Sequence, residues 1–241
     1  MFILNTDTIN EVNSFSDWID ICNTLGSAIL INKNKDWSSF DVVAKMRNIT
    51  TIRKIGHCGT LDPFATGLLI LCLGKGTKQI NTFQNLPKQY KATIKIGCTT
   101  KSSDTEHTEE NICDFAHIKN NEIESVISSF KGIINQVPPM FSAKKIKGKK
   151  LYELARQNIE IELKSVEVEI YNIEVNKIDL PFIDIIIDCS KGTYIRALAR
   201  DIGIKLNVGA YLTQLERTKI GNHSVYNAFT IDKLEGLYVK L

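Results

Sequence analysis

The sequence predicts an α+β or mixed α/β fold organised around one large sheet. Strand patterns and helix patterns alternate irregularly along the 241 residues, and the strand patterns are long, with few tight-hairpin signals between them. Hydrophobic residues make up 43% of the chain, which is enough for a sizeable core, and the 24% of charged residues is ordinary for a soluble protein. The length fits one large domain or two lobes.

Charge and cysteine content restrict the class of protein only loosely. The net charge of +3 is mildly basic and does not by itself indicate a nucleic-acid partner. None of the six cysteines has Cys-x-x-Cys spacing, which argues against a zinc ribbon or a thioredoxin motif. The N-terminus lacks a secretory signal, and no apolar run approaches the ~20 residues of a membrane span. We therefore expect a reduced, cytoplasmic protein.

Residues 1–25 are polar and mixed, and we expect them to form an N-terminal appendage of unknown role, outside the core. Within this segment Ser14 is placed to cap a short helix that reaches Cys22. Residues 27–33 indicate a strand, and Ser38 begins a Ser-x-x-Asp capping-box pattern ahead of helical spacing. Lys33 is therefore expected between a strand and a helix N-terminus.

The segment 54–73 (KIGHCGTLDPFATGLLILCL) combines three glycines, one Asp-Pro step and a continuous apolar run. The run 68–73 indicates a buried strand, so the polar turn before it lies at the edge of a core. Pro63 disfavours a helical conformation for Asp62. An acid held by a stiff turn above a buried strand is a candidate nucleophile or general base. The alternative is an Asx-turn in which Asp62 caps its own backbone, and the local pattern alone favours that alternative.

The next two segments have contrasting patterns. Residues 74–78 (GKGTK) resemble a phosphate loop but do not match the spacing of one, and a turn opening a helix fits better. Residues 89–97 alternate strictly, which predicts a half-buried strand with Tyr90 near its start. Tyr90 is then a core or rim aromatic unless it faces a cleft.

The middle of the chain changes sign of charge. Residues 98–114 are acidic and are expected to form an exposed loop, followed by a helix over 121–130. Residues 131–150 then contain six lysines and no acid. This basic segment is equally consistent with contacts to phosphates and with a run of charges that faces solvent. The lysines of interest are Lys144, Lys145, Lys147, Lys149 and Lys150.

The C-terminal part repeats the strand-turn-helix arrangement. We expect a helix over 151–157, strands within 159–178 and over 182–189, a helix to about 206, a strand over 212–220 and a terminal helix over 230–237. Thr193 is the expected N-cap of the helix that carries Tyr194 and Arg196 in its first turn.

Four stretches together resemble the bacterial tRNA pseudouridine synthases of the TruB type, which modify uridine 55 in the T-loop. The stretches are GHCGTLDPFATG, the K-x-Y strand with Tyr90, the segment VPPMFSAKKIKGKKLYELAR, and CSKGTYIR. They occur in the family's order, and the resemblance covers residues 29–237. It implies a pseudouridine synthase fold: one large mixed, mainly antiparallel sheet flanked by helices, with a central active-site cleft in a catalytic domain over 26–241.

The resemblance also implies roles for individual residues. Asp62 would be the nucleophile that attacks the flipped uridine or its sugar, and Arg196 would pair with it and help keep it ionised. Tyr90 would stack on the flipped base, and His57 would contact the RNA beside it. The remaining implied positions are Tyr194 and Leu215 in the uridine pocket, Lys33 near the active site, and Asp104 in the loop after the Tyr90 strand.

The implied enzyme needs neither metal nor cofactor, acts on the T-arm of tRNA, and is expected to be a monomer. The chain departs from the family at Asn32 and Asn34 around Lys33, and at Lys101. We expect no small C-terminal RNA-binding (PUA-type) domain of the kind that most members have, so tRNA affinity would depend more on the lysines of 144–150.

Two other functions compete with this one. An RNA-binding or tRNA-folding module with dispensable catalysis would explain the basic segment but would not need Asp62, Tyr90 and Arg196. A nucleoside hydrolase would need a second carboxylate beside Asp62, and none is evident. His57 and Cys58 are adjacent in the sequence, and adjacent residues rarely form a metal-binding pair or a Cys-His nucleophile.

Overall fold

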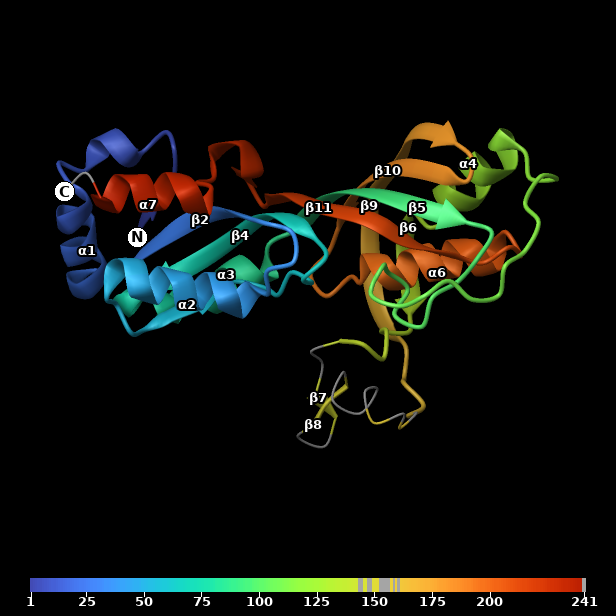
Figure 1. The fold of residues 1–241 in the computed structure, drawn as a ribbon, viewed down its shortest axis with the longest axis horizontal. Coiled ribbons are helices and arrows are strands. Elements are labelled where there is room, and N and C mark those ends of the chain that lie inside the picture. The colour runs from blue at the N-terminus through green and yellow to red at the C-terminus, as the bar shows by residue number, and fades with distance from the viewer. Residues whose placement is uncertain (143–144, 147–148, 152–156, 158, 160, 240–241) are drawn as a thin grey trace. The chain divides into compact units, whose positions relative to one another are not determined.

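The computed structural model describes residues 1–241 except 143–144, 147–148, 152–156, 158, 160 and 240–241 (Figure 1). For 145–146, 149–150 and 237–239 only the backbone is described. The chain divides into two compact units. Unit 1 comprises Met1–Gln89 and Glu216–Leu241, and unit 2 comprises Tyr90–Leu215. Two strands, β5 (Lys88–Ile96) and β11 (Ala210–Ile220), contribute residues to both units.

Unit 1 contains a mixed sheet with the strand order β1-β2-β4-β11. Its strands are β1 (Phe2–Leu4), β2 (Ser27–Lys33), β4 (Thr66–Leu73) and the last residues of β11, with β3 (Ile55–His57) paired to β4 and β12 (His223–Ser224) paired to β11. The strand β2 runs antiparallel to β4, whereas β11 runs parallel to β4 at the start of that strand.

Both faces of β2 and β4 are buried, which explains the continuous apolar run 68–73. Ile29, Ile31, Leu69 and Leu71 share a core with three helices (Figure 1), and the alternate residues of each strand pack in a second core with Phe83. The helices are α1 (Phe15–Thr24), α2 (Ser39–Thr50) and α7 (Ile231–Val239), and Phe83 belongs to α3 (Ile80–Asn85). Short 3₁₀ helices cover Ile9–Glu11, Gly74–Gln79 and Val225–Asn227.

Both helix starts expected in the first forty residues are confirmed. Ser14 caps α1 through the backbone N–H of Asp17, and Ser38 caps α2 in a full capping box with Asp41. The expectation that residues 1–25 lie outside the core is wrong. Trp18 is fully buried, and its indole N–H donates to Ser27 Oγ on β2 at 2.8 Å. The short apolar face of α1 is enough to complete the core of unit 1.

Unit 2 contains the strand order β11-β5-β10-β9-β6. The strand β9 (Val166–Asp179) pairs antiparallel with both β10 (Phe182–Cys189) and β6 (Gly132–Gln136). The helices of unit 2 include α4 (Asn120–Ser128) and α6 (Ile195–Lys205), and the short strands β7 (Lys145–Ile146) and β8 (Lys149–Lys150) pair with each other. Burial alternates along β5 as predicted.

Three local predictions for unit 2 need comment. The N-cap of α6 is Tyr194 and not Thr193, whose hydroxyl instead donates to the carbonyl of Ser190 at 3.0 Å. The loop over 98–114 is not uniformly exposed, because Ser102 and Asp104 are buried in it. The helix expected over 151–157 lies mostly outside the described residues.

Candidate active site

The Asp62 loop, residues 58–65, connects β3 to β4 in unit 1. Gly59 has φ +112°, a conformation that favours glycine, and the Ala65 N–H donates to the Asp62 carbonyl at 3.1 Å to close the turn. Ser39, in the first turn of α2, holds the loop from the helix side. Its Oγ accepts from the Leu61 N–H at 2.8 Å and donates to the Leu61 carbonyl at 3.1 Å. Asp62 itself is partly exposed.

Lys33 is the last residue of β2, and its side chain is fully buried against the Asp62 loop. The ammonium donates to the carbonyls of Asn34 at 2.8 Å, Trp37 at 2.7 Å and Pro63 at 3.2 Å. Burial lowers the pKa of Lys33 to about 8, although the negative charge of Asp62 opposes the shift. Lys33 therefore connects the turn after β2 to the residue directly after Asp62.

His57, the last residue of β3, is half-buried beside the same loop. Burial lowers its pKa, and the positive charge of Arg217 adds to the shift, so the imidazole is neutral near pH 7. Its Nδ1 is buried and has no hydrogen-bond partner among the described residues. A neutral imidazole suits a hydrogen bond to a nucleotide better than an ion pair with a phosphate.

Cys58 does not form a nucleophile with His57. Its thiol lies 3.3 Å from that of Cys72 on β4, and both residues are fully buried. The hydrogen bond that the Cys58 thiol makes with the Cys72 thiol, together with burial, raises the pKa of Cys58. The thiolate form needed for attack is therefore disfavoured.

In unit 2, Arg196 stands in the first turn of α6 and is almost fully buried. Its Nη1 lies 3.3 Å from Asp104 Oδ2 and donates to the Ser102 carbonyl at 3.2 Å, and its Nη2 donates to the Phe141 carbonyl at 2.7 Å. Asp104 is buried as well, and its Oδ1 accepts from Ser102 Oγ at 2.5 Å and from the Glu106 N–H at 2.9 Å. The network fixes the direction of the guanidinium group.

Tyr194 is positioned by Gln136, a residue that the sequence did not single out. The side-chain amide of Gln136 donates to the Tyr194 carbonyl at 3.1 Å and accepts from its N–H at 2.8 Å. Gln136 is buried at the end of β6, directly before Val137 and the two prolines. The position of Gln136 directly before the two prolines was the one sequence feature that could have drawn attention to it. Its pairing with a residue 58 positions away cannot be inferred from spacing.

The structure places the predicted site residues in both units. Lys33, His57 and Asp62 belong to unit 1, whereas the remaining substrate residues belong to unit 2, namely Tyr90, Tyr194, Arg196 and Leu215. Tyr90 and Leu215 are buried there. The pairing of Asp62 with Arg196 stays a prediction.

The predicted RNA-binding lysines fall in the least described part of the chain. Lys144 and Lys147 lie outside the described residues. The backbones of Lys145, Lys149 and Lys150 belong to the paired strands β7 and β8, and their side chains are not described.

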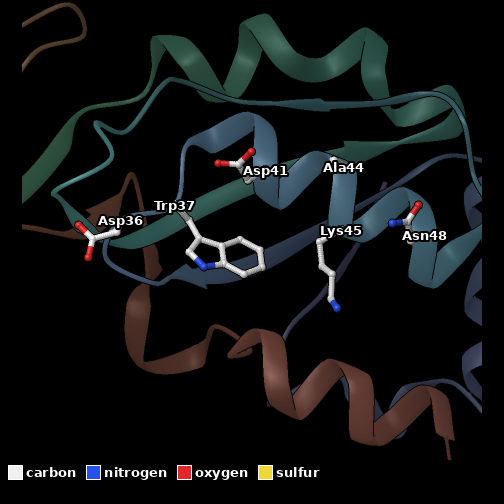
Figure 2. A pocket seen from close by; sticks show the side chains of 6 residues that line it. All are labelled: Asp36, Trp37, Asp41, Ala44, Lys45 and Asn48. Atoms are coloured by element: carbon white, nitrogen blue, oxygen red, sulfur yellow. The ribbon is translucent and has the colours of Figure 1, made fainter.

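A hollow of about 380 Å³ in unit 1 lies next to α2 (Figure 2). Asp36 and Trp37 line it from the turn after β2, and the other lining residues, Asp41, Ala44, Lys45 and Asn48, come from α2. Lys45 forms an ion pair with Glu235 of α7. None of the predicted site residues lines this hollow, but its lining residue Asp36 donates its N–H to the Pro63 carbonyl of the Asp62 loop at 2.8 Å.

The described residues contain neither a metal-binding cluster nor a membrane-spanning helix. No group of three or more histidine, cysteine, aspartate or glutamate side chains is arranged to hold a metal ion in the described part of the chain. Over the same residues, no helix combines the length and apolar character that crossing a membrane requires.

Residues 47–195 match the TruB family pseudouridylate synthase (N terminal domain). This match covers more than half of the chain and includes the Asp62 loop, β5 and the start of α6. The chain belongs to the TruB family. The resemblance found in the sequence is thereby confirmed.

Relatives of this TruB-family chain are identical to it at close to half of the aligned positions. The tRNA pseudouridine synthase B of Parabacteroides distasonis is 48% identical over 81% of this chain and 86% of that protein. The tRNA pseudouridine synthase B of Clostridium tetani is 46% identical over 87% of this chain and 73% of that protein.

Solved structures confirm the pseudouridine synthase fold. A chain in the structure of an H/ACA RNP bound to a substrate RNA containing 2'-deoxyuridine aligns with a TM-score of 0.68 at 24% identity, covering 91% of this chain. A chain in a Cbf5-Nop10-Gar1 complex aligns with a TM-score of 0.67 at 26% identity, covering 89% of this chain. The present chain spans 56% of the length of each of these two chains.

Proposed function

We propose that this chain isomerises uridine 55 in the T-loop of tRNA to pseudouridine, with Asp62 as the nucleophile. The observation that carries the proposal is the Asp62 loop: a carboxylate that is partly exposed, in a turn whose backbone is held by Ser39 and Lys33, within the segment that matches the TruB family. Curated relatives named tRNA pseudouridine synthase B support the choice of tRNA as substrate.

The reaction breaks the bond between N1 of uracil and C1′ of ribose and forms a bond between C5 and C1′. A proton leaves C5 and a proton is gained at N1, so no redox partner or external group is consumed. Asp62 attacks the flipped uridine or its sugar and holds one part covalently while the base turns. The target base must leave the folded tRNA to react, and Tyr90 provides the aromatic surface on which it stacks.

Arg196 supplies the positive charge opposite Asp62 in this proposal. Its link to Asp104 and to two backbone carbonyls supports that role, because a guanidinium held from several sides loses little freedom when a second carboxylate approaches. Tyr194 and Leu215 line the uridine pocket, and His57 contacts the RNA beside it.

The lysines of the 144–150 segment favour a second function, in which the protein binds and helps to fold tRNA independently of catalysis. The same basic surface serves both functions, since tRNA must bind before it reacts. We further propose that the protein acts as a cytoplasmic monomer on the T-arm, without metal or cofactor.

The test is to incubate unmodified tRNA transcript with wild-type protein and with Asp62→Asn, and to map pseudouridine along the tRNA. The proposal expects modification at position 55 by the wild type, none by the variant, and tRNA affinity within about threefold between them, because one uncharged isostere removes little binding surface. Equal turnover by the variant contradicts the proposal. Rescue of a deletion strain by the variant would favour the tRNA-folding function.

A further inference from the structure

Arg217 of β11 is a buried arginine of unit 1 that the proposed mechanism does not use. Its side chain is 1% exposed, and its guanidinium donates to three backbone carbonyls: Nε to Leu68 at 2.8 Å, Nη1 to Thr60 at 3.2 Å and Nη2 to Gly59 at 3.3 Å. Within the part of the chain that the structure describes, no carboxylate forms an ion pair with it. Burying a charge is costly unless its donors are satisfied, and here each of the three guanidinium nitrogens donates to a carbonyl.

Two of the three carbonyls that Arg217 contacts, those of Gly59 and Thr60, lie in the Asp62 loop shortly before Asp62, and the third, that of Leu68, lies on β4. Irregular loops lack the regular partners that a strand or helix gives its backbone, so their carbonyls must be satisfied in other ways. Here all five consecutive carbonyls from 59 to 63 accept a hydrogen bond. Arg217 serves the first two, Ser39 Oγ the third, the Ala65 N–H the fourth, and Lys33 Nζ the fifth.

Gly67 allows Arg217 to come this close. The two residues face each other where β4 and β11 pair. A Cβ on Gly67 would lie 2.4 Å from the Arg217 carbonyl oxygen, and Gly67 has φ +104°. The sequence therefore brings the β11 backbone against the start of β4, from which the Arg217 side chain reaches back to the loop.

Two buried cations thus bracket Asp62 along the chain. Arg217 bonds the backbone on its N-terminal side, and Lys33 bonds the backbone on its C-terminal side. Lysine at position 217 would carry the same charge but lacks the planar fork that reaches three carbonyls in fixed directions.

We propose that Arg217 is a positioning residue that holds the Asp62 loop in the geometry required for attack on uridine. It acts through the loop backbone and does not touch the substrate. The inference deepens the proposed function and rests on it for its catalytic consequence. The clamping of the loop is a separate claim that can be measured without any reaction.

The experiment compares Arg217→Lys and Arg217→Gln with wild type and with Met46→Ala. Met46 is fully buried on α2 in the core of the same unit and has no role in the proposed reaction, so its truncation controls for lost stability. Urea unfolding identifies conditions in which each protein is folded. Single-turnover rates and tRNA affinities are then measured, together with hydrogen–deuterium exchange of peptides from the Asp62 loop and from β2.

The proposal expects the chemical rate of both Arg217 variants to fall by about 100-fold, with tRNA affinity within about threefold of wild type, since a small misplacement of a reacting group is costly. Exchange should accelerate in the Asp62 loop and stay unchanged in β2. Met46→Ala should retain a rate close to wild type.

Arg217→Lys with a rate within threefold of wild type would overturn the proposal, as would an equal loss in Met46→Ala. Failure of both Arg217 variants to fold would also overturn it, because the residue would then hold the unit and not the loop. Wild-type protein that makes no pseudouridine would refute the proposed function alone, and the exchange data would still decide whether Arg217 clamps the loop.

Discussion

At the scale of single residues, buried cations account for much of the candidate site. Lys33, Arg196 and Arg217 are each at most 3% exposed, and each donates to backbone carbonyls of a loop. Of the three, Arg196 forms an ion pair with a carboxylate of the described part of the chain, that of Asp104. Their charges hold irregular backbone in place, and this role can be separated from direct catalysis by its pH dependence and by its effect on stability.

Lys33 predicts a specific pH profile. Its pKa is lowered to about 8, and deprotonation leaves two N–H donors for three carbonyls. We expect the single-turnover rate to decline as pH rises through about 8, and this decline to be absent from the slower Lys33→Met variant. A wild-type rate that stays flat from pH 7 to 9.5 would contradict the role given to the ammonium.

Stability should move in the opposite direction over the same pH range. The pKa of Lys33 is lower in the folded protein than its ordinary 10.5, so between about pH 8 and 10.5 the unfolded chain holds more protons. The contribution of Lys33 to the unfolding free energy therefore rises with pH in this window. Urea unfolding at pH 8 and pH 10 measures this change in the unfolding free energy. Because the Lys33 contribution rises, a loss of reaction rate in this pH range cannot be ascribed to unfolding caused by Lys33.

Gln136 gives a second prediction at this scale. Replacing it with leucine leaves the partly buried N–H and carbonyl of Tyr194 without their partners, at a cost of up to about 1–3 kcal/mol for each group. We expect Gln136→Leu to lower the unfolding free energy by about 2–4 kcal/mol and to reduce pseudouridine formation. Gln214→Leu, at an exposed position of β11, is the control and should change stability by less than about 0.5 kcal/mol. Equal unfolding free energies of the two variants would show that the pairing of the Gln136 amide with Tyr194 does not contribute to stability.

At the scale of elements, periodicity predicted the strands and helices whose burial pattern follows from their own residues. The alternation of β5, the apolar run of β4 and the capping box of α2 are determined within a few residues, so the sequence alone was sufficient. The N-cap of α6 was misplaced because the Thr193 hydroxyl is used by the preceding turn. The role of α1 was missed because Trp18 depends on β1 and β2 to form its environment.

The paired strands β7 and β8 carry the element-scale prediction. If the lysines at 144, 145, 147, 149 and 150 contact phosphates, replacing all five with glutamine should flatten the slope of log affinity against log salt by as much as about 3.5 to 4.5. Filter binding of tRNA over a range of salt concentrations measures the slope. Lys177→Gln, an exposed lysine paired with Asp179, is the control. An unchanged slope in the fivefold variant would show that these lysines do not contact phosphates.

At the scale of the whole molecule, the proposed chemistry needs groups from both units. Asp62 belongs to unit 1, and Tyr90 and Arg196 belong to unit 2. The order of the motifs in the sequence predicted these residues, because each motif is local and could be compared with the TruB family without the structure. Arg217 and Gln136 were not identified, since each acts through a contact with backbone far away in the sequence, and such contacts leave no spacing signal.

The most direct measurement uses tRNA labelled with tritium at C5 of uridine, because forming the bond between C5 and C1′ releases that hydrogen to water. Wild-type protein should release one equivalent of tritium per tRNA, Asp62→Asn should release none, and Asp20→Asn, an exposed carboxylate on α1, should behave as wild type. Release by Asp62→Asn at the wild-type rate would contradict the assignment of Asp62 as the nucleophile.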